Sequence, residues 1–165
     1  MTPRRPYSIR YIVFALVFAG LGLNPGAQAQ NKNSKYACSE PNPASICTAS
    51  NTCGSSSEPC SVDVKRSANS ASATPSIQGA KGNSTFCVKA GTTVIWKSDT
   101  KHEGFIVDMG PKTPFATDDI IGGSDKQVTT VAKTPGCYKY SIGACLSGAI
   151  YGMCENTTAE LVVVQ

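Results

Sequence analysis

A ten-residue segment near the end of the chain holds the side chains best suited to chemistry. It reads CLSGAIYGMC, from Cys145 to Cys154, with Gly148 inside it and Met153 directly before the second cysteine. Thiolate and thioether sulfurs bind soft metal ions such as Cu(I), whereas two cysteines in an oxidising environment commonly form a disulfide. One sulfur atom cannot do both. The segment therefore predicts either a metal-ligand loop or a disulfide loop.

Residues 1–29 have the composition of a signal peptide. The basic start MTPRRPYSIR precedes the apolar run YIVFALVFAGLGL, whose thirteen residues are too few to span a bilayer comfortably. The residues Ala27-Gln28-Ala29 fit the small-x-small rule for cleavage, so the mature chain is expected to begin near Gln30. We therefore expect a periplasmic or secreted protein with no membrane segment after cleavage.

The mature part is nearly neutral and contains all eight cysteines. Cleavage removes three arginines, which leaves twelve Lys and Arg against eleven Asp and Glu. Nucleic-acid binding needs a basic surface that this composition does not supply, so we expect an unidentified protein partner or a redox partner. An even number of cysteines in an oxidising compartment predicts disulfides. The candidates are Cys38, Cys47, Cys53, Cys60, Cys87, Cys137, Cys145 and Cys154.

Catalysis is limited by the presence of one histidine, His102. A serine or cysteine nucleophile needs a base, and only His102 is available to act as one. Cys145 would have to stay reduced among seven other cysteines in an exported protein, which does not favour a catalytic role. The acidic residues accompany no calcium or phosphate motif. We therefore expect no enzyme activity.

Two stretches of the mature chain lack the patterns that predict regular structure. Residues 30–60 carry four cysteines among Ser, Asn, Pro and Ala, with almost no large apolar residue. Such a segment has to be ordered by cross-links, either within itself or onto the domain that follows. Residues 67–82, SANSASATPSIQGAKG, are small and polar and are predicted to form a loop or linker. Residues 61–165 are expected to form the folded domain.

Short β-branched and aromatic stretches predict about seven strands in that domain. Turn-forming residues lie between them, and no window has a helical period. This pattern predicts an all-β protein, an antiparallel Greek-key β-sandwich. The predicted strands are residues 61–65, 85–89, 92–97, 104–107, 127–131, 137–140 and 159–164.

Two of these segments resemble the cupredoxins, the β-sandwich proteins that include plastocyanin and azurin. VKAGTTVIWKSDTKHEGFIV, residues 88–107, is similar to the family's strand, glycine turn, strand ending in Trp and loop that carries the first histidine ligand. His102 stands in the place of that histidine. PGCYKYSIGACLSGAIYGM, residues 135–153, is similar to the region that carries the other ligands, and AELVVV to the last strand. The resemblance implies a cupredoxin-like fold and a copper site of His102, Cys145 and Met153.

The ligand pattern of that family, C-x2-H-x4-M, is incomplete in this sequence. Met153 stands eight positions after Cys145, as the pattern requires, but Gly148 occupies the position of the second histidine. A second alignment, counted from Gly136, places Ile142 at the cysteine position and Cys145 at the second histidine. Each alignment therefore lacks one ligand.

Two functional hypotheses follow. The first is an exported cupredoxin-like binding or structural module, with a degenerate, metal-free copper site stapled by four disulfides. Its pairing is either Cys145–Cys154 with Cys87–Cys137, or a bond from Cys137 to Cys145 or to Cys154. The alternative is a copper-binding electron-transfer protein that uses His102, Cys145 and Met153 and leaves the fourth position open. The expected cofactor is accordingly none, or copper.

Overall fold

The structure, a computed structural model, describes residues 36–39, 42–152 and 157–165. All of them belong to one compact unit, Asn31–Gln165. The described residues form ten strands and a short 3-10 helix, η2 (Pro43–Ile46). The strands are β1 (Cys60–Ser67), β2 (Ser70–Pro75), β3 (Phe86–Lys89), β4 (Thr93–Lys97), β5 (Gly104–Asp108), β6 (Asp119–Gly123), β7 (Val128–Val131), β8 (Gly136–Leu146), β9 (Ala149–Tyr151) and β10 (Thr158–Val164).

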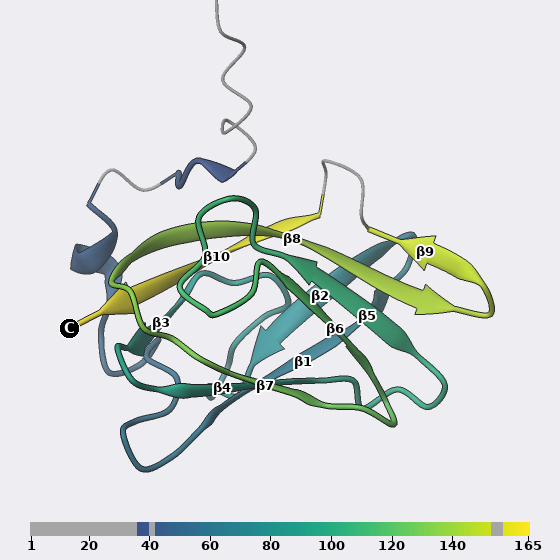
Figure 1. The fold of residues 1–165 in the computed structure, drawn as a ribbon, viewed down its shortest axis with the longest axis horizontal. Coiled ribbons are helices and arrows are strands. Elements are labelled where there is room, and N and C mark those ends of the chain that lie inside the picture. The colour runs from purple at the N-terminus through teal and green to yellow at the C-terminus, as the bar shows by residue number, and fades with distance from the viewer. Residues whose placement is uncertain (1–35, 40–41, 153–156) are drawn as a thin grey trace, which may run out of the picture. The chain divides into compact units, whose positions relative to one another are not determined.

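The strands form the two layers of a β-sandwich (Figure 1). One sheet has the order β2-β1-β4-β7, and the other has the order β3-β10-β8-β5-β6 with β9 also paired to β8. Most neighbouring strands are antiparallel, but β1 pairs with β4 and β3 pairs with β10 in parallel. The predicted all-β sandwich is therefore confirmed, with two mixed sheets in place of purely antiparallel ones.

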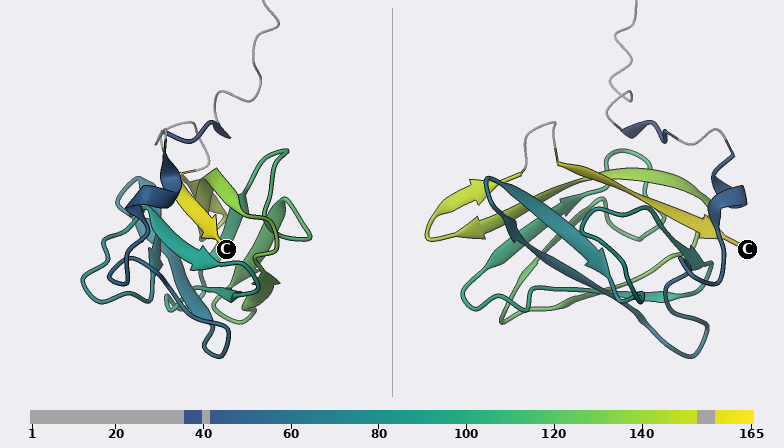
Figure 2. Two further views of the ribbon diagram at one scale, coloured as in Figure 1. Left: turned by 90° about the vertical axis from the view of Figure 1, so that its left-hand side faces the viewer. Right: turned by 180° about the vertical axis from the view of Figure 1, so that it is seen from behind.

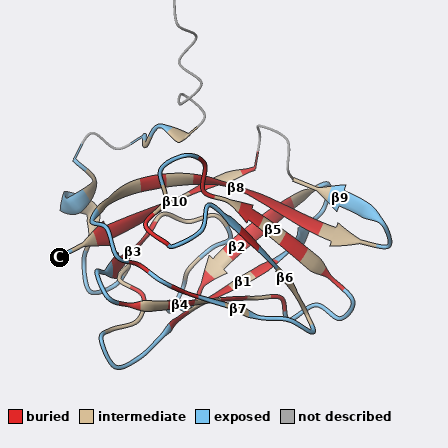
Figure 3. Ribbon diagram, viewed as in Figure 1, coloured by how far each residue is buried: buried red, intermediate tan, exposed pale blue. Residues whose placement is uncertain are grey.

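The core lies between the sheets because the strands alternate inward and outward side chains. Figure 3 shows this alternation as red and paler segments along the strands. Trp96 of β4 is fully buried, and its ring meets the rings of Phe115 and Tyr140 edge-on, with centroids 6.0 and 5.8 Å away. Its Nε1 donates a hydrogen bond to Thr130 Oγ1 at 3.1 Å. We call the side of each sheet that faces the core its inner face and the opposite side its outer face.

All seven predicted strands are present, and three strands were not predicted. β2 occupies residues 70–75, inside the stretch 67–82 that was predicted to be a loop or linker. Its small side chains hide the alternation, yet Ala71 and Ala73 are fully buried and β2 pairs with β1 throughout its length. β6 and β9 are short strands that contain or adjoin glycines.

The cysteine-rich segment is fastened to the outer face of the second sheet. We call its described residues, 36–39 and 42–53, the strap. Disulfides join Cys38 to Cys137 of β8 and Cys47 to Cys87 of β3, and a third joins Cys53 to Cys60. η2 contacts β10 and β8, and both views of Figure 2 place it beside the C-terminal end of β10. Two disulfides therefore join the cysteine-rich segment to the folded domain, and the third lies within the segment, so both predicted kinds of cross-link are present.

The predicted pairing of Cys87 with Cys137 is wrong. Both residues pair with Val162 of β10, from opposite sides, so they lie two strand spacings or roughly 9.5 Å apart. A disulfide cannot bridge that distance, because its Cα atoms must lie within about 7 Å. A bond from Cys137 to Cys145 is also wrong, since the two lie on one strand and are separated by about 26 Å at 3.3 Å per residue.

Cys137 is bonded to Cys38, which also excludes its predicted alternative bond to Cys154. Cys154 itself, Met153 and the predicted signal peptide, residues 1–29, lie outside the described residues. Within the described part of the chain, no helix has the length and apolar character needed to cross a membrane.

Candidate functional site

The first half of the CLSGAIYGMC segment is a β-hairpin. β8 continues to Leu146, and β9 returns from Ala149 after the two-residue turn Ser147-Gly148. Both turn residues have positive φ, 51° and 80°, which is the backbone of the type I′ turns that suit the twist of a hairpin. Gly148, which occupies the position of the family's second histidine in one alignment, is therefore a turn residue.

Cys145 points to the outer face of its sheet. Its neighbour Ala144 pairs with Phe105, and both are buried in the core, so Cys145 must point the other way. Cys145 pairs with Gly104 of β5 on one side and with Ile150 of β9 on the other. The side chain is partly exposed, and it makes no disulfide with any described residue. Its predicted bond to Cys154 falls outside the described residues.

Ile142 occupies the inner face, where the second alignment places the family's copper-binding cysteine. It pairs with Val107 of β5, and both side chains are fully buried. An apolar side chain therefore fills this position, and no sulfur ligand is directed into the core from it. Ile142 and Cys145 point to opposite faces because they are three residues apart on one strand.

His102 lies in the turn before β5, with φ of 61° and an exposed side chain. Its backbone N–H donates to Ser124 Oγ at 3.1 Å. It borders an open cleft of about 430 Å³ that also contacts Gly104, Ile121 and Lys126. His102 precedes Gly104, the partner of Cys145, by two residues, so the structure brings these two predicted ligands to the same end of the sheet.

Glu103, beside that histidine, was predicted from the sequence either to pair with the imidazole or to face solvent, but it is a buried acid. Its Oε1 accepts a hydrogen bond from the Arg66 backbone N–H at 2.7 Å, and its Oε2 accepts one from Ser98 Oγ at 2.8 Å. These bonds join the end of β1 to the loop between β4 and β5. Glu103 therefore positions the His102 turn and does not pair with the imidazole.

The β8–β9 hairpin is anchored to the other sheet by two close contacts. The Arg66 guanidinium lies 3.9 Å from the centroid of the Tyr151 ring, a cation–π geometry. Gly152, with φ of 92°, packs so closely on β2 that an added Cβ would lie 2.7 Å from the Ala71 nitrogen. Both contacts place the hairpin against β1 and β2.

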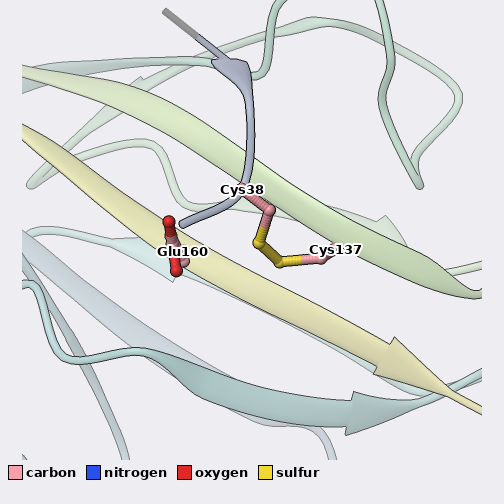
Figure 4. A group of neighbouring side chains, drawn as sticks. All are labelled: Cys38, Cys137 and Glu160. Carbon is pink, nitrogen blue, oxygen red and sulfur yellow. A yellow bond between two sulfur atoms is a disulfide. The ribbon is translucent and has the colours of Figure 1, made fainter. Parts of the chain in front are cut away.

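One described group of side chains has the composition of a metal site, and it lies elsewhere. Ligand atoms of Cys38, Cys137 and Glu160 all lie within 4.8 Å of one another (Figure 4). The two sulfurs are joined as a disulfide, so neither is available as a thiolate in this state. Sequence reasoning missed this group because it depends on which strand the strap crosses. One indication of this group was present in the sequence, the acidic residue Glu160 within the predicted last strand.

Comparison with known proteins gives matches among solved structures only. No family model and no curated protein sequence matches the chain. An oxidized mutant of amicyanin is 12% identical over 70% of this chain and 95% of its own, with a TM-score of 0.38. A copper protein rusticyanin is 18% identical over 68% of this chain and 81% of its own, with a TM-score of 0.41. Reduced rusticyanin is 16% identical over 68% of this chain and 83% of its own, with a TM-score of 0.39.

The strands lie where the sequence resemblance to the cupredoxins predicts them. The first segment of resemblance forms the end of β3, a glycine turn, β4 ending at Trp96 and Lys97, and β5. The second forms β8 and β9, and the last strand is β10, as expected. TM-scores this low relate no individual residues, so the copper ligands of amicyanin and rusticyanin are not assigned to this chain.

Proposed function

We propose that the protein is an exported, non-catalytic binding or structural module on a cupredoxin-like sandwich whose copper site has been lost. The observation that carries this proposal is the β8–β9 hairpin. Cys145 lies on the outer face of this hairpin, opposite Ile150 in the strand register. Ile142 fills the inner-face position where the second alignment places the family's copper-binding cysteine. A copper centre of this family needs a thiolate and imidazoles that converge on one point. Three disulfides support an oxidising compartment.

The outer face beyond the strap supports a role in binding. Ile121 and Ile150 are 58% and 60% exposed and flank the position of Cys145 and Gly104. Exposed aliphatic side chains on this face are available to contact an apolar surface of another protein. The partner expected from the sequence would therefore bring a complementary apolar surface to this face.

The alternative is a copper-binding electron-transfer protein that uses His102, Cys145 and Met153. One observation favours it: Cys145 has no disulfide partner among the described residues and lies opposite Gly104, close in sequence to His102. Such a centre would form at the surface of the sheet, with an open position for water. It would exchange its metal readily, because few protein ligands hold it.

A copper titration of the unreduced, metal-stripped mature protein separates the two functions. We expect no intense visible thiolate-to-copper absorption and no difference between the wild type and the Cys145→Ser variant. Alkylation with mass mapping in the same sample reports whether Cys145 is free. Intense absorption that is lost in both Cys145→Ser and His102→Ala would instead establish the copper function.

A further inference from the structure

The group formed by Cys38, Cys137 and Glu160 comes from three separate elements of the fold. Cys137 on β8 pairs with Val162, and Glu160 stands two residues before Val162 on β10, so both side chains share the outer face at diagonal positions. Diagonal neighbours on adjacent strands are within reach of long side chains. Cys38 comes from the strap above them (Figure 4).

The carboxylate of this group is already positioned. The Ser39 backbone N–H donates to Glu160 Oε1 at 2.7 Å, which leaves Oε2 available to a ligand. Lys139 stands directly opposite Glu160 in the strand register. Its positive charge would offset part of the negative charge that two thiolates and a carboxylate bring together.

We propose that Cys38, Cys137 and Glu160 bind Zn²⁺ when the Cys38–Cys137 disulfide is reduced, so that the strap is held either by a covalent bond or by a metal. Two thiolates and one carboxylate are ligands that zinc accepts, and water would complete its four-coordinate shell. The Cα atoms of the two cysteines are 5.9 Å apart, so both sulfurs reach one ion without movement of the strands. This site shares no residue with the copper ligands considered above.

The redox step balances with a dithiol as reductant. The Cys38–Cys137 bond breaks, each sulfur gains a proton, and the dithiol becomes a disulfide. Zn²⁺ then displaces both protons as the sulfurs bind it as thiolates. Without reduction the sulfurs carry no charge and the site has one ligand only.

This disulfide is the most accessible of the three among the described residues. Cys38 and Cys137 are both half-buried, whereas Cys53 and Cys60 are 1% and 0% exposed and Cys87 is fully buried. A reductant in solution therefore reaches the Cys38–Cys137 bond first. Zinc would then keep the strap over Val162, which lies between Cys87 and Cys137 and is almost fully buried.

The test is metal binding by mature protein that carries Cys145→Ser and Cys154→Ser, so that these two thiols cannot contribute. A water-soluble phosphine, which does not compete for zinc, is added until one disulfide has opened, and mass mapping identifies which one. Circular dichroism confirms that the sheets persist. Cd²⁺ then serves as a spectroscopic probe for zinc through its ultraviolet thiolate-to-metal absorption, and Zn²⁺ is tested for displacing it.

We expect one equivalent of Cd²⁺ in the reduced protein and none in the oxidised protein. Glu160→Gln should weaken binding by about tenfold or more, and Glu58→Gln, which changes an exposed carboxylate outside the group, should leave it unchanged. Zn²⁺ should also slow the alkylation of Cys38 and Cys137. Equal binding before and after reduction, protection of other cysteines, or the same affinity in Glu160→Gln would overturn the proposal.

Discussion

The Cys38–Cys137 bond should supply a large part of the stability of this protein. Its partners are 99 residues apart, but the Cys47–Cys87 bond, which remains in a Cys38→Ala/Cys137→Ala variant, shortens the effective loop to about 60 residues. The chain-entropy relation then gives a loss of about 4 kcal/mol when the bond is removed. Domains of this size are stable by roughly 5–15 kcal/mol, so the loss is a large share of the total. At about 2.1 cal/mol/K of unfolding entropy per residue, it should lower the Tm by about 15 °C.

Urea unfolding followed by the fluorescence of Trp96 measures this loss, since Trp96 is the only tryptophan and is buried in the core. Tyr36→Phe is the matched control, because it removes a strap hydrogen bond, from the Tyr36 hydroxyl to Asp108 Oδ2 at 2.5 Å, and keeps the disulfide. It should cost about 1 kcal/mol. If the double variant loses no more than this control, the strap does not constrain the unfolded chain and the reasoning fails.

Three further predictions concern single side chains, each measured by the same unfolding assay. Tyr140→Phe should be neutral or about 1 kcal/mol stabilising, because the Tyr140 hydroxyl is fully buried with no hydrogen-bond partner among the described residues. Asn83→Ala should cost about 2 kcal/mol, because Asn83 Oδ1 accepts a hydrogen bond from the Ala73 N–H and Asn83 Nδ2 donates one to Ala71 O. The backbone of Asn83 also has φ of 62°, which alanine adopts less readily. Asn83→Gly removes the same hydrogen bonds without the backbone strain, so it separates the two contributions. Burial, and to a smaller extent the hydrogen bond to Asp108, raises the pKa of Tyr36 from 10.0 to about 12. The neutral hydroxyl therefore stabilises the fold fully below pH 10, and this stabilisation is lost as the pH rises towards 12. Tyr36→Phe should lack that part of the alkaline loss, and an identical pH profile in both proteins would contradict the assignment.

Strands with large alternating side chains could be predicted from the sequence. Thr93–Lys97 and Thr158–Val164 are rich in β-branched residues, and each forms a strand near the expected boundaries. β2 escaped prediction because serine and alanine, its principal residues, alternate without a large difference in hydrophobicity. Its position follows only from pairing with β1, which is a tertiary effect.

Disulfide pairing depends on strand order, which the sequence does not specify. Cys87 and Cys137 are both outward residues of strands, and they become unable to bond only because β10 lies between β3 and β8. Each is instead bonded to a cysteine of the strap. The same strand order brings Glu160 beside Cys137. Its place in the metal-capable group could therefore not be predicted either.

The register of β8 decides where any copper bound through Cys145 would lie. Turning Cys145 towards the core requires a slip of one residue, and such a slip moves every side chain of a strand to the opposite face. Tyr140, Ile142 and Ala144 would then leave the core, where all three are fully buried. Burial of one large apolar side chain contributes about 1.5–3 kcal/mol, so exposing Tyr140 and Ile142 would cost a large share of the total stability. A copper ion held by Cys145 would therefore bind on the outer face beside Gly104, in contact with water, and not between the sheets.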